Sequence, residues 1–320
     1  MRQHLPLFST VFSNDPKQYS SCIVSGTSVS SCTDSSSTYS TLRLVTTSTT
    51  FSSCNWNSCS APNDSGSAIQ CTGSEIVLTV EKCFFISCSS DREGGAIHTS
   101  SIHTLDVKES FFYKCSTSTT SDNHGSGAIW IYGIQQKLSI VNNDFISCTS
   151  TASGGAFIVW KCFDNIKGET ISSCRYIDCN ATDTTPDGGA VWIWDNSELI
   201  GVSECLFSIC NSYYGGGLDH YLSNYDSGTY PIRFCFFNKN VGDCGNDVHL
   251  FLLNTQKGSP FLQCFSTTEE LRIGYLDQSS NGVYDITIQN AWLPLGTLLS
   301  LNAFTTASIN HSLSRTLTQL

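Results

Sequence analysis

Val80-Glu81-Lys82-Cys83-Phe84-Phe85-Ile86-Ser87-Cys88 is one copy of a nine-residue pattern that decides the fold of this chain. The pattern holds an apolar residue, then a small residue three positions later, an aromatic residue two positions after that, and a second small residue at its end. It occurs seven times, at Phe51–Cys59, Val80–Cys88, Val107–Cys115, Ile140–Cys148, Ile171–Cys179, Val202–Cys210 and Ile232–Asn240. The central aromatic residues are 27 to 33 positions apart, and a period near 30 residues indicates a stacked repeat architecture.

A glycine-rich step followed by an apolar run lies between successive copies. The steps are Gly66–Ile69, Gly94–Ile97, Ser126–Ile129, Gly154–Phe157, Gly188–Val191, Gly215–Leu218 and, in a weak form, Gly245–Val248. Glycine at these points suits a turn that needs positive φ, or a close approach between layers of backbone. Each repeat therefore contains a turn, a short strand after the glycine step, a second strand, and then the aromatic residue.

Apolar residues alternate with polar ones between these landmarks, as in Leu105-x-Val107 and Leu138-x-Ile140, which is typical of strands. We predict an all-β fold: a right-handed parallel β-helix with about seven coils of about 30 residues, stacked about 4.8 Å apart. A β-propeller is the rival, but its repeats need about 40 residues or more. The predicted parts are a Ser/Thr-rich coil or cap at 1–50, the repeats at 51–265, and a β cap or frayed tail at 266–320.

Seventeen cysteines are far more than a cytosolic chain ordinarily carries. Most fall into two columns in phase with the repeat, and Ser110 and Asn143 take the cysteine's place in the first. The second column is predicted to be a structural ladder made of Cys59, Cys88, Cys115, Cys148, Cys179, Cys210 and Asn240. Exchange among Cys, Ser and Asn favours free thiols that fill space, while disulfides between neighbouring coils remain the alternative. The spacing of the cysteines along the chain does not match that of a zinc site. We therefore expect no metal and no cofactor.

The net charge of −11, with only 13% charged residues, argues against a nucleic-acid partner. The first residues lack the apolar core of a signal peptide, and the longest apolar run, 291–301, is too short to span a bilayer and contains Pro294. The chain is therefore expected to carry no transmembrane segment. The cysteine content favours the cell surface or secretion for this chain or for a longer protein that contains it, and the cytoplasm is the alternative.

The alternation of glycine steps with F-x-x-[N/C] resembles the polymorphic outer membrane protein family. Gly94-Gly95-Ala96-Ile97 and Gly188-Gly189-Ala190-Val191 match its GGA-[I/L/V] motif, and Phe237-x-x-Asn240 matches its F-x-x-N motif. Cysteine replaces that asparagine in six copies, which is similar to the expanded set of such proteins in parasitic trichomonads. The resemblance covers about residues 51–250 and implies a right-handed parallel β-helix, of the pectin-lyase-like kind, that acts as a surface-exposed adhesin or interaction module.

Enzymes also occur on parallel β-helices, so the fold alone does not settle function. A glycosidase needs two carboxylates on one face, and the candidates are Asp178, Asp183, Asp187 and Asp219, with His220 nearby. Asp183 and Asp187 lie in a turn where aspartate is common, and Asp219 and His220 point to opposite faces of a strand. We therefore expect no enzyme. A polysaccharide-acting lyase or hydrolase and a purely structural repeat protein are the alternatives.

The strands after the glycine steps carry aromatic residues at their second and fourth positions. If the first and third residues face the core, the second and fourth form an outer ladder. Its members are Trp130, Tyr132, Trp160, Trp192, Trp194 and Tyr221. Contiguous exposed aromatic residues mark binding surfaces, so we expect an adhesin-like binding module that contacts a glycan or a host-surface protein. The alternatives are that long turns cover this face, or that these residues belong to the core.

Overall fold

The computed structural model describes most of the chain between residues 21 and 300. The backbone is described for 21–25, 28–35, 42–44, 48–119, 125–162, 169–183, 186–195, 200–222, 232–244, 246–252, 261–266, 270–277, 282–289 and 299–300. Side chains are described for 48–119, 125–161, 171–183, 186–194, 200–221, 232–243 and 246–249.

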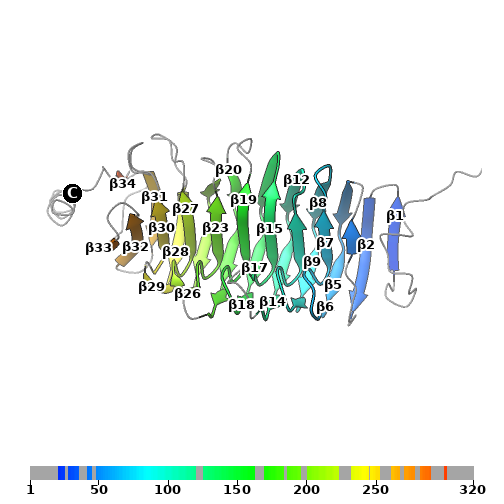
Figure 1. The fold of residues 1–320 in the computed structure, drawn as a ribbon, viewed down its shortest axis with the longest axis horizontal. Coiled ribbons are helices and arrows are strands. Elements are labelled where there is room, and N and C mark those ends of the chain that lie inside the picture. Colours follow the sequence, from blue (N-terminus) through cyan, green and yellow to red (C-terminus); the bar gives the residue numbers. More distant parts are fainter. Residues whose placement is uncertain are drawn as a thin grey trace, which may run out of the picture.

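These residues form an all-β parallel solenoid of about six turns with coils of about 30 residues, and none of the described elements is a helix. The strands stack along the long axis of the molecule, from the N-terminal to the C-terminal end (Figure 1). Three sheets run along this axis. The predicted all-β parallel solenoid with coils of about 30 residues is therefore confirmed, with about six turns where about seven were predicted. A repeat that buries one apolar face per strand becomes stable only when neighbouring coils cover each other.

Sheet A has 17 strands and contains every nine-residue copy. Its strands before the first small residue of each copy are β4 (Thr49–Ser52), β8 (Val77–Glu81), β12 (Thr104–Lys108), β16 (Lys137–Val141), β20 (Glu169–Ser172), β24 (Gly201–Ser203) and the start of β28 (Ile232–Asn238). Its strands around the central aromatic residue are β5 (Asn55–Asn57), β9 (Phe84–Ile86), β13 (Phe111–Tyr113), β17 (Asp144–Ile146), β21 (Arg175–Ile177) and β25 (Leu206–Ser208). The ends add β1 (Ser21–Ser25), β2 (Ser28–Ser35), β31 (Phe261–Ser266) and β34 (Leu299–Ser300).

The other two sheets complete each coil. Sheet B contains β6 (Ser60–Ala61), β10 (Ser89–Ser90), β14 (Ser116–Thr117), β18 (Thr149–Ser150), β22 (Asn180–Ala181), β26 (Asn211–Tyr214) and β29 (Val241–Cys244). Sheet C contains β3 (Leu42–Leu44), β7 (Ile69–Thr72), β11 (Ile97–Ser100), β15 (Ile129–Ile134), β19 (Phe157–Cys162), β23 (Val191–Asp195), β27 (Leu218–Leu222), β30 (Val248–Leu252), β32 (Glu270–Asp277) and β33 (Gly282–Gln289). A coil has four short strands, because the aromatic residue and the pair after the second small residue each form a strand in addition to the two predicted.

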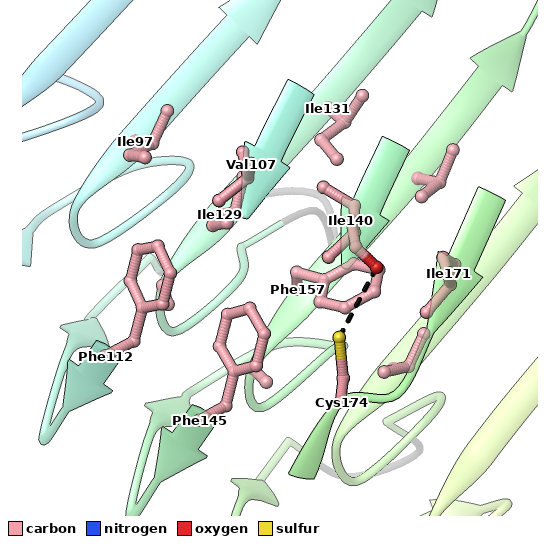
Figure 2. Packing of buried hydrophobic residues seen from close by; sticks show 14 of the residues in the cluster. Ile97, Val107, Phe112, Ile129, Ile131, Ile140, Phe145, Phe157, Ile171 and Cys174 are labelled. Atoms are coloured by element: carbon pink, nitrogen blue, oxygen red, sulfur yellow. Dashed lines mark hydrogen bonds between the residues drawn. The ribbon is translucent and has the colours of Figure 1, made fainter. Parts of the chain in front are cut away.

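The central aromatic residues form an unbroken stack through the core. Successive rings lie nearly parallel, with centroids 4.7 to 5.2 Å apart, from Trp56 through Phe85, Phe112, Phe145, Tyr176 and Phe207 to Phe237. This separation is close to the spacing of hydrogen-bonded strands, so the backbone ladder sets the distance between the rings. Figure 2 shows two of these rings, Phe112 and Phe145, beside the Val/Ile column and Phe157.

Each nine-residue copy bends twice, just before each of its two small residues. The residue before each small residue has φ between +50° and +60°, as at Lys82, Ser87, Glu109 and Lys114. This left-handed conformation costs a non-glycine residue about 1–2 kcal/mol. The bend is held by hydrogen bonds to the next coil, such as Lys82 N–H to the Lys108 carbonyl at 3.1 Å and Ser87 N–H to the Tyr113 carbonyl at 2.8 Å. The spacing within a copy is constant because both bends must match those of the neighbouring coils.

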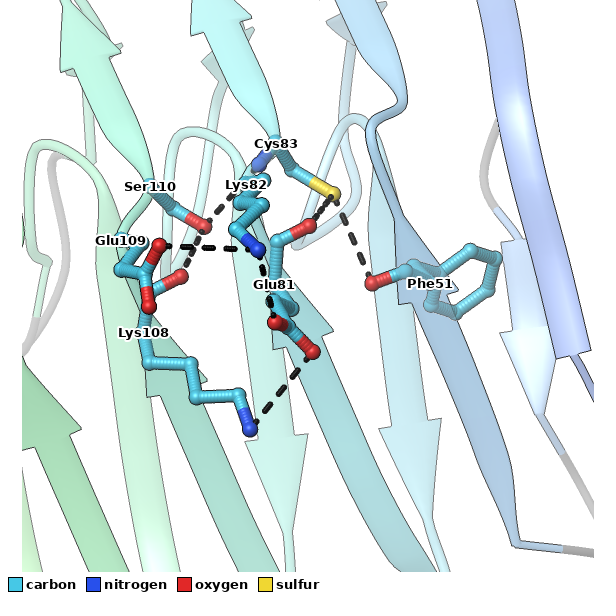
Figure 3. A network of polar contacts seen from close by, with 7 residues as sticks. All are labelled: Phe51, Glu81, Lys82, Cys83, Lys108, Glu109 and Ser110. Carbon is cyan, nitrogen blue, oxygen red and sulfur yellow. Dashed lines mark hydrogen bonds and ion pairs between the residues drawn. The ribbon is translucent and has the colours of Figure 1, made fainter.

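The cysteines point inward from these bends and contact backbone carbonyl groups. The Cys83 thiol lies 3.6 Å from the Phe51 carbonyl of the preceding coil and 3.2 Å from the Glu81 carbonyl (Figure 3). Cys174 contacts the Ile140 carbonyl in the same way, at 3.4 Å (Figure 2). A thiol is a weak donor that packs as a small apolar group, so it suits a buried site with a carbonyl nearby.

The two cysteine columns accept Ser and Asn because these side chains donate hydrogen bonds to backbone carbonyls, as the thiols do, and also accept hydrogen bonds from neighbouring N–H groups. Asn143 Nδ2 donates to the Val107 carbonyl at 2.8 Å, and its Oδ1 accepts from Ser110 N–H at 2.9 Å. Ser110 Oγ accepts from Cys83 N–H at 3.1 Å (Figure 3). Asn240 repeats the asparagine arrangement between the Phe207 carbonyl and Cys210 N–H. These positions therefore require a small donor rather than a thiol.

All twelve cysteines with described side chains are buried and take part in no disulfide bond, which agrees with the thiol interpretation. Six of them, with Asn240, are the predicted second column, and all seven lie in the core. Burial raises the pKa of the Cys71 thiol to about 12 and raises the pKa of Cys115 and Cys210 well above the ordinary value. The thiols of Cys71, Cys115 and Cys210 are therefore neutral and unreactive. The described residues contain no group of three or more His, Cys, Asp or Glu placed to hold a metal ion.

The glycine steps place two backbones too close for a side chain. A Cβ on Gly155 would lie 2.1 Å from the Gly189 carbonyl oxygen and 2.5 Å from Asn180 N, both in the next coil. The first glycine of most steps has φ near +60°, as at Gly154 and Gly188. One glycine thus supplies the turn and the other the close approach.

The described strands at both ends include antiparallel pairs. β1 pairs antiparallel with β2, and β32 pairs antiparallel with β33 over eight residue pairs. Such pairs change the direction of the chain at the ends of the stack, where an exposed parallel edge would otherwise be a site for aggregation.

Substitution of a close-approach glycine should unfold the solenoid more readily than substitution of a turn glycine. We expect Gly155→Ala to lower the free energy of unfolding by about 3 kcal/mol, because the new methyl group collides with backbone. Gly133→Ala is the matched control: its Cβ meets no atom closer than 3.4 Å, so only the φ of +67° costs energy, about 1 kcal/mol. Urea unfolding of both variants checks this, and equal losses would contradict the close-approach role.

Candidate functional site

The outward face of sheet C carries the aromatic residues singled out from the sequence. In-register pairing aligns the second positions of its strands in one column and the fourth positions in another. The second-position column is Gln70, His98, Trp130, Ile158, Trp192, Asp219 and His249. The first and third positions are buried in the core, as expected from alternation.

The second-position column is covered although it points away from the core. Trp130 and Trp192 are only 8% and 3% exposed, and with Ile158 they form a second apolar cluster. The glycine turns lie against this column: a Cβ on Gly154 would be 2.5 Å from Ile158 Cγ1, and one on Gly66 would be 2.9 Å from His98 Cβ. Trp130 and Trp192 therefore support the surface from below and cannot contact a large ligand directly.

The fourth-position column forms the outer layer, and we call Tyr132, Trp160, Trp194 and Tyr221 the outer aromatic column. Trp194 is 36% exposed, and the other three side chains are half-buried. Trp194 and Tyr221 stack with centroids 4.7 Å apart and planes 9° apart. Trp160 meets Tyr132 at 6.3 Å, edge-on, and Trp194 at 6.4 Å. Four aromatic side chains on successive coils therefore line one accessible strip, with Lys161 Nζ 5.9 Å from the Tyr132 ring centre.

A second group of polar side chains lies at the C-terminal end of the same sheet. His249 Nδ1 and Asp219 Oδ1 are 2.8 Å apart, and both side chains are about 95% buried. Asp187, from the turn before β23, hydrogen-bonds to Asp219 through its side chain. The His249 ring lies 4.9 Å from the ring of Tyr214. The structure thus gathers two carboxyl groups and one imidazole from three successive coils.

Asp178 and His220 do not join this group. Asp178 is exposed and accepts a hydrogen bond from Ser147 Oγ at 2.9 Å, and Asp183 stays in its turn. His220 lies in the core with no exposed surface, where burial lowers its pKa to about 3. His98 is at the opposite end of the column, five strands away from His249.

The pairing of His249 with Asp219 was not predicted from the sequence. Both residues follow the apolar residue after a glycine step, in Leu218-Asp219 and Val248-His249. This shared position was a usable signal, because equal positions on neighbouring coils become adjacent in register.

The environment of Asp187 favours its neutral form. Burial raises its pKa to about 8, and the negative charge of Asp219 adds to the effect. A neutral Asp187 can donate to Asp219, and Asp219 can accept from Nδ1–H of His249. His249 Nε2 is buried and has no hydrogen-bond partner among the described residues. The arrangement could hold a proton or accept a hydrogen bond from a ligand.

Stability should therefore fall as the pH rises from about 4 to about 8. The folded state keeps the Asp187 proton up to about pH 8, while the unfolded state loses it near pH 4. The stabilisation that the Asp187 proton gives to the folded state is complete below about pH 4 and is lost above about pH 8. In Asp187→Asn the melting temperature should change less between pH 5 and pH 8 than in the wild type, and Asp178→Asn should behave like the wild type. An unchanged pH dependence in Asp187→Asn would contradict the shared proton.

Comparison with known proteins leaves this chain without an assigned relative. No family model, no curated protein and no solved structure matches it. None of the described residues forms a helix long and apolar enough to cross a membrane. The established description is thus structural: the chain is a cysteine-rich parallel β-solenoid of about six turns.

Proposed function

We propose that this chain is a non-catalytic, adhesin-like binding module at the cell surface or in a secreted protein, and that it binds glycans through the outer aromatic column. The observation that carries the proposal is the row of accessible aromatic residues on four successive coils, with Trp194 and Tyr221 stacked 4.7 Å apart. Aromatic rings contact apolar faces of a ligand at small entropic cost, and Trp and Tyr dominate interface energetics.

The buried cluster beneath the column supports this function. Trp160 packs on Trp192 at 6.1 Å and on Trp130 at 6.5 Å. A strip built on a packed layer keeps its side chains in place, which lowers the ordering cost of binding. A rigid, regular strip suits a repeating ligand such as an oligosaccharide better than it suits an irregular protein surface.

The repeat motifs support membership of a Cys-rich branch of the polymorphic outer membrane protein family, with a right-handed coil. The glycine step and the F-x-x-[N/C] motif both occupy defined structural positions: one provides the close approach, and the other the ring stack and the inward ladder residue. The likeness supports an adhesive role at a surface.

A polysaccharide-acting enzyme is the second candidate, favoured by the convergence of Asp187, Asp219 and His249. A hydrolase of this kind needs an acid and a base on opposite sides of the bond that breaks. The close hydrogen-bonded contact of Asp187 and Asp219 favours a shared proton instead. A glycan that is bound and recovered intact supports the binding module, whereas shortened products support the enzyme.

Removal of the most exposed ring in the outer aromatic column should weaken glycan binding. We expect Trp194→Ala to weaken binding to oligosaccharides on an array at least tenfold, because losing a central aromatic contact costs about 2 kcal/mol or more. Phe84→Ala is the matched control, since Phe84 is half-exposed on sheet A. Equal binding by both variants would contradict the proposed site. If the protein binds host proteins but no glycan, the proposed glycan ligand is wrong and a protein is the ligand.

Surface location has its own test in the source cells. A membrane-impermeant amine reagent should label the protein on intact cells, because exposed lysines such as Lys82 and Lys114 lie on the solenoid. An abundant cytosolic protein from the same cells serves as the control for leakage. Protection of this chain in intact cells, with labelling only after lysis, would contradict surface display.

A further inference from the structure

The outward side of sheet A is largely apolar along the strands that carry the central aromatic residues. The residues just before and just after each central ring point away from the core. In-register pairing aligns the residues before the rings into a first column that reads Asn55, Phe84, Phe111, Asp144, Arg175, Leu206 and Phe236. The residues after the rings form a second column that reads Asn57, Ile86, Tyr113, Ile146, Ile177, Ser208 and Asn238. We call the part of both columns on the six coils from Phe84 to Asn238 the sheet A face.

Neighbouring side chains of the sheet A face contact one another. The rings of Phe84 and Phe111 have centroids 6.1 Å apart, and Phe111 lies 6.2 Å from Tyr113 of the second column. Asp144 and Arg175 form an ion pair in which Nε and one terminal nitrogen of the guanidinium each donate to a carboxylate oxygen. Because successive strands are about 4.8 Å apart, the two columns make one continuous surface.

The sheet A face is accessible although most of its members are apolar. Phe84 and Phe236 are 50% and 45% exposed, and the side chains of Ile86, Phe111, Tyr113, Ile146, Ile177 and Leu206 are half-buried. The left-handed bends on both sides of the face carry mostly Ser, Lys, Glu, Asn and Asp. An apolar centre between polar rims is typical of a protein–protein interface.

The first column has the same chemistry when it is read from either end, with the signs of charge exchanged. On one side of its centre, Asp144 is followed by Phe111 and Phe84. On the other side, Arg175 is followed by Leu206 and Phe236. A two-fold axis that runs along the strand direction between β17 and β21 therefore turns acid onto base and apolar onto apolar. Such a surface is complementary to a second copy of itself, as a symmetric dimer requires.

The second column fits the same arrangement at its centre. Ile146 and Ile177 pair across β17 and β21, on either side of the axis, so four isoleucines of two copies would meet where interfaces have their strongest contacts. At the rim, Glu109 of one copy comes opposite Glu204 of the other. Lys82, whose Nζ lies 3.7 Å from the Glu109 carboxylate, offsets that repulsion.

The area of the sheet A face fits a weak dimer. Its six coils extend over five strand spacings, about 24 Å. Twelve side chains that each present about 50 Å² give about 600 Å². A stable interface buries about 800 Å² on each partner. The dimer should therefore form at micromolar rather than nanomolar concentrations.

We propose that two copies of this chain pack sheet A against sheet A as an antiparallel two-fold dimer, with Asp144 of one copy opposite Arg175 of the other. A guanidinium has five N–H donors, so Arg175 can bond to its own Asp144 and to that of the second copy. The apolar members of the first column then pack on one another in reverse order. Sheet C is a separate sheet of each coil, so the dimer carries two outer aromatic columns outside this interface.

Charge reversal at the centre tests the proposal by analytical ultracentrifugation of the complete chain at about 1 to 200 µM. We expect the wild type to dimerise, and Asp144→Arg and Arg175→Asp each to weaken dimerisation at least tenfold, because four like charges then meet at the axis. An equimolar mixture of the two variants should dimerise again. Each acid then faces a base across the interface, although neither copy regains its internal ion pair.

Asp106→Arg is the matched control, because it makes the same change of charge on a strand of sheet A outside the face and should leave the dimer unchanged. The exchange variant Asp144→Arg/Arg175→Asp keeps the internal ion pair and should dimerise like the wild type. A wild-type chain that stays monomeric at the highest concentration would overturn the proposal. A mixture of the single variants that stays monomeric would also overturn it, as would a wild-type dimer that both single variants leave intact.

Discussion

The hydrogen-bonded spacing between successive coils is the constraint on which the rest of this structure depends. Rings from Trp56 to Phe237 stack at 4.7 to 5.2 Å because the strands that carry them are one ladder spacing apart. A ring of any other thickness would leave a void or force the coils apart. The aromatic column, the Val/Ile column and the small-residue columns are therefore in phase, and insertions occur only between copies.

The two bends of each nine-residue copy show how the chain turns sharply at positions that carry no glycine. Each copy places non-glycine residues in the left-handed region twice, and inter-coil hydrogen bonds hold them there. The inward residue that follows must be small and must face a carbonyl, as Cys83 faces Phe51 and Asn143 faces Val107. The high cysteine content thus has a packing reason that is independent of disulfide formation, and it does not by itself indicate an oxidising compartment.

Sheet C carries the candidate functional residues on its outward side. Its second-position column forms a buried layer, and its fourth-position column forms the accessible aromatic strip above it. The same two-layer arrangement brings Asp219 beside His249 and under the turn that carries Asp187. A surface built this way is stiff and regular, which suits recognition of a repeating ligand. Function on a solenoid is then a matter of which residues occupy outward columns, because the inward columns are committed to stacking.

The sequence by itself determined the repeat, the strand alternation and the identity of the core columns. These features depend on spacing within about ten residues, and the spacing in Val80–Cys88 is the same as in Ile171–Cys179. Only the tertiary structure decided that Trp130 and Trp192 are covered while Trp194 is not, since glycine turns pack against one outward column and leave the other open. It also decided that Asp187 and Asp219 meet, while Asp178 is exposed and bonds to Ser147. Such contacts depend on how turns of variable length fold over the neighbouring coils, and the repeat pattern does not encode that.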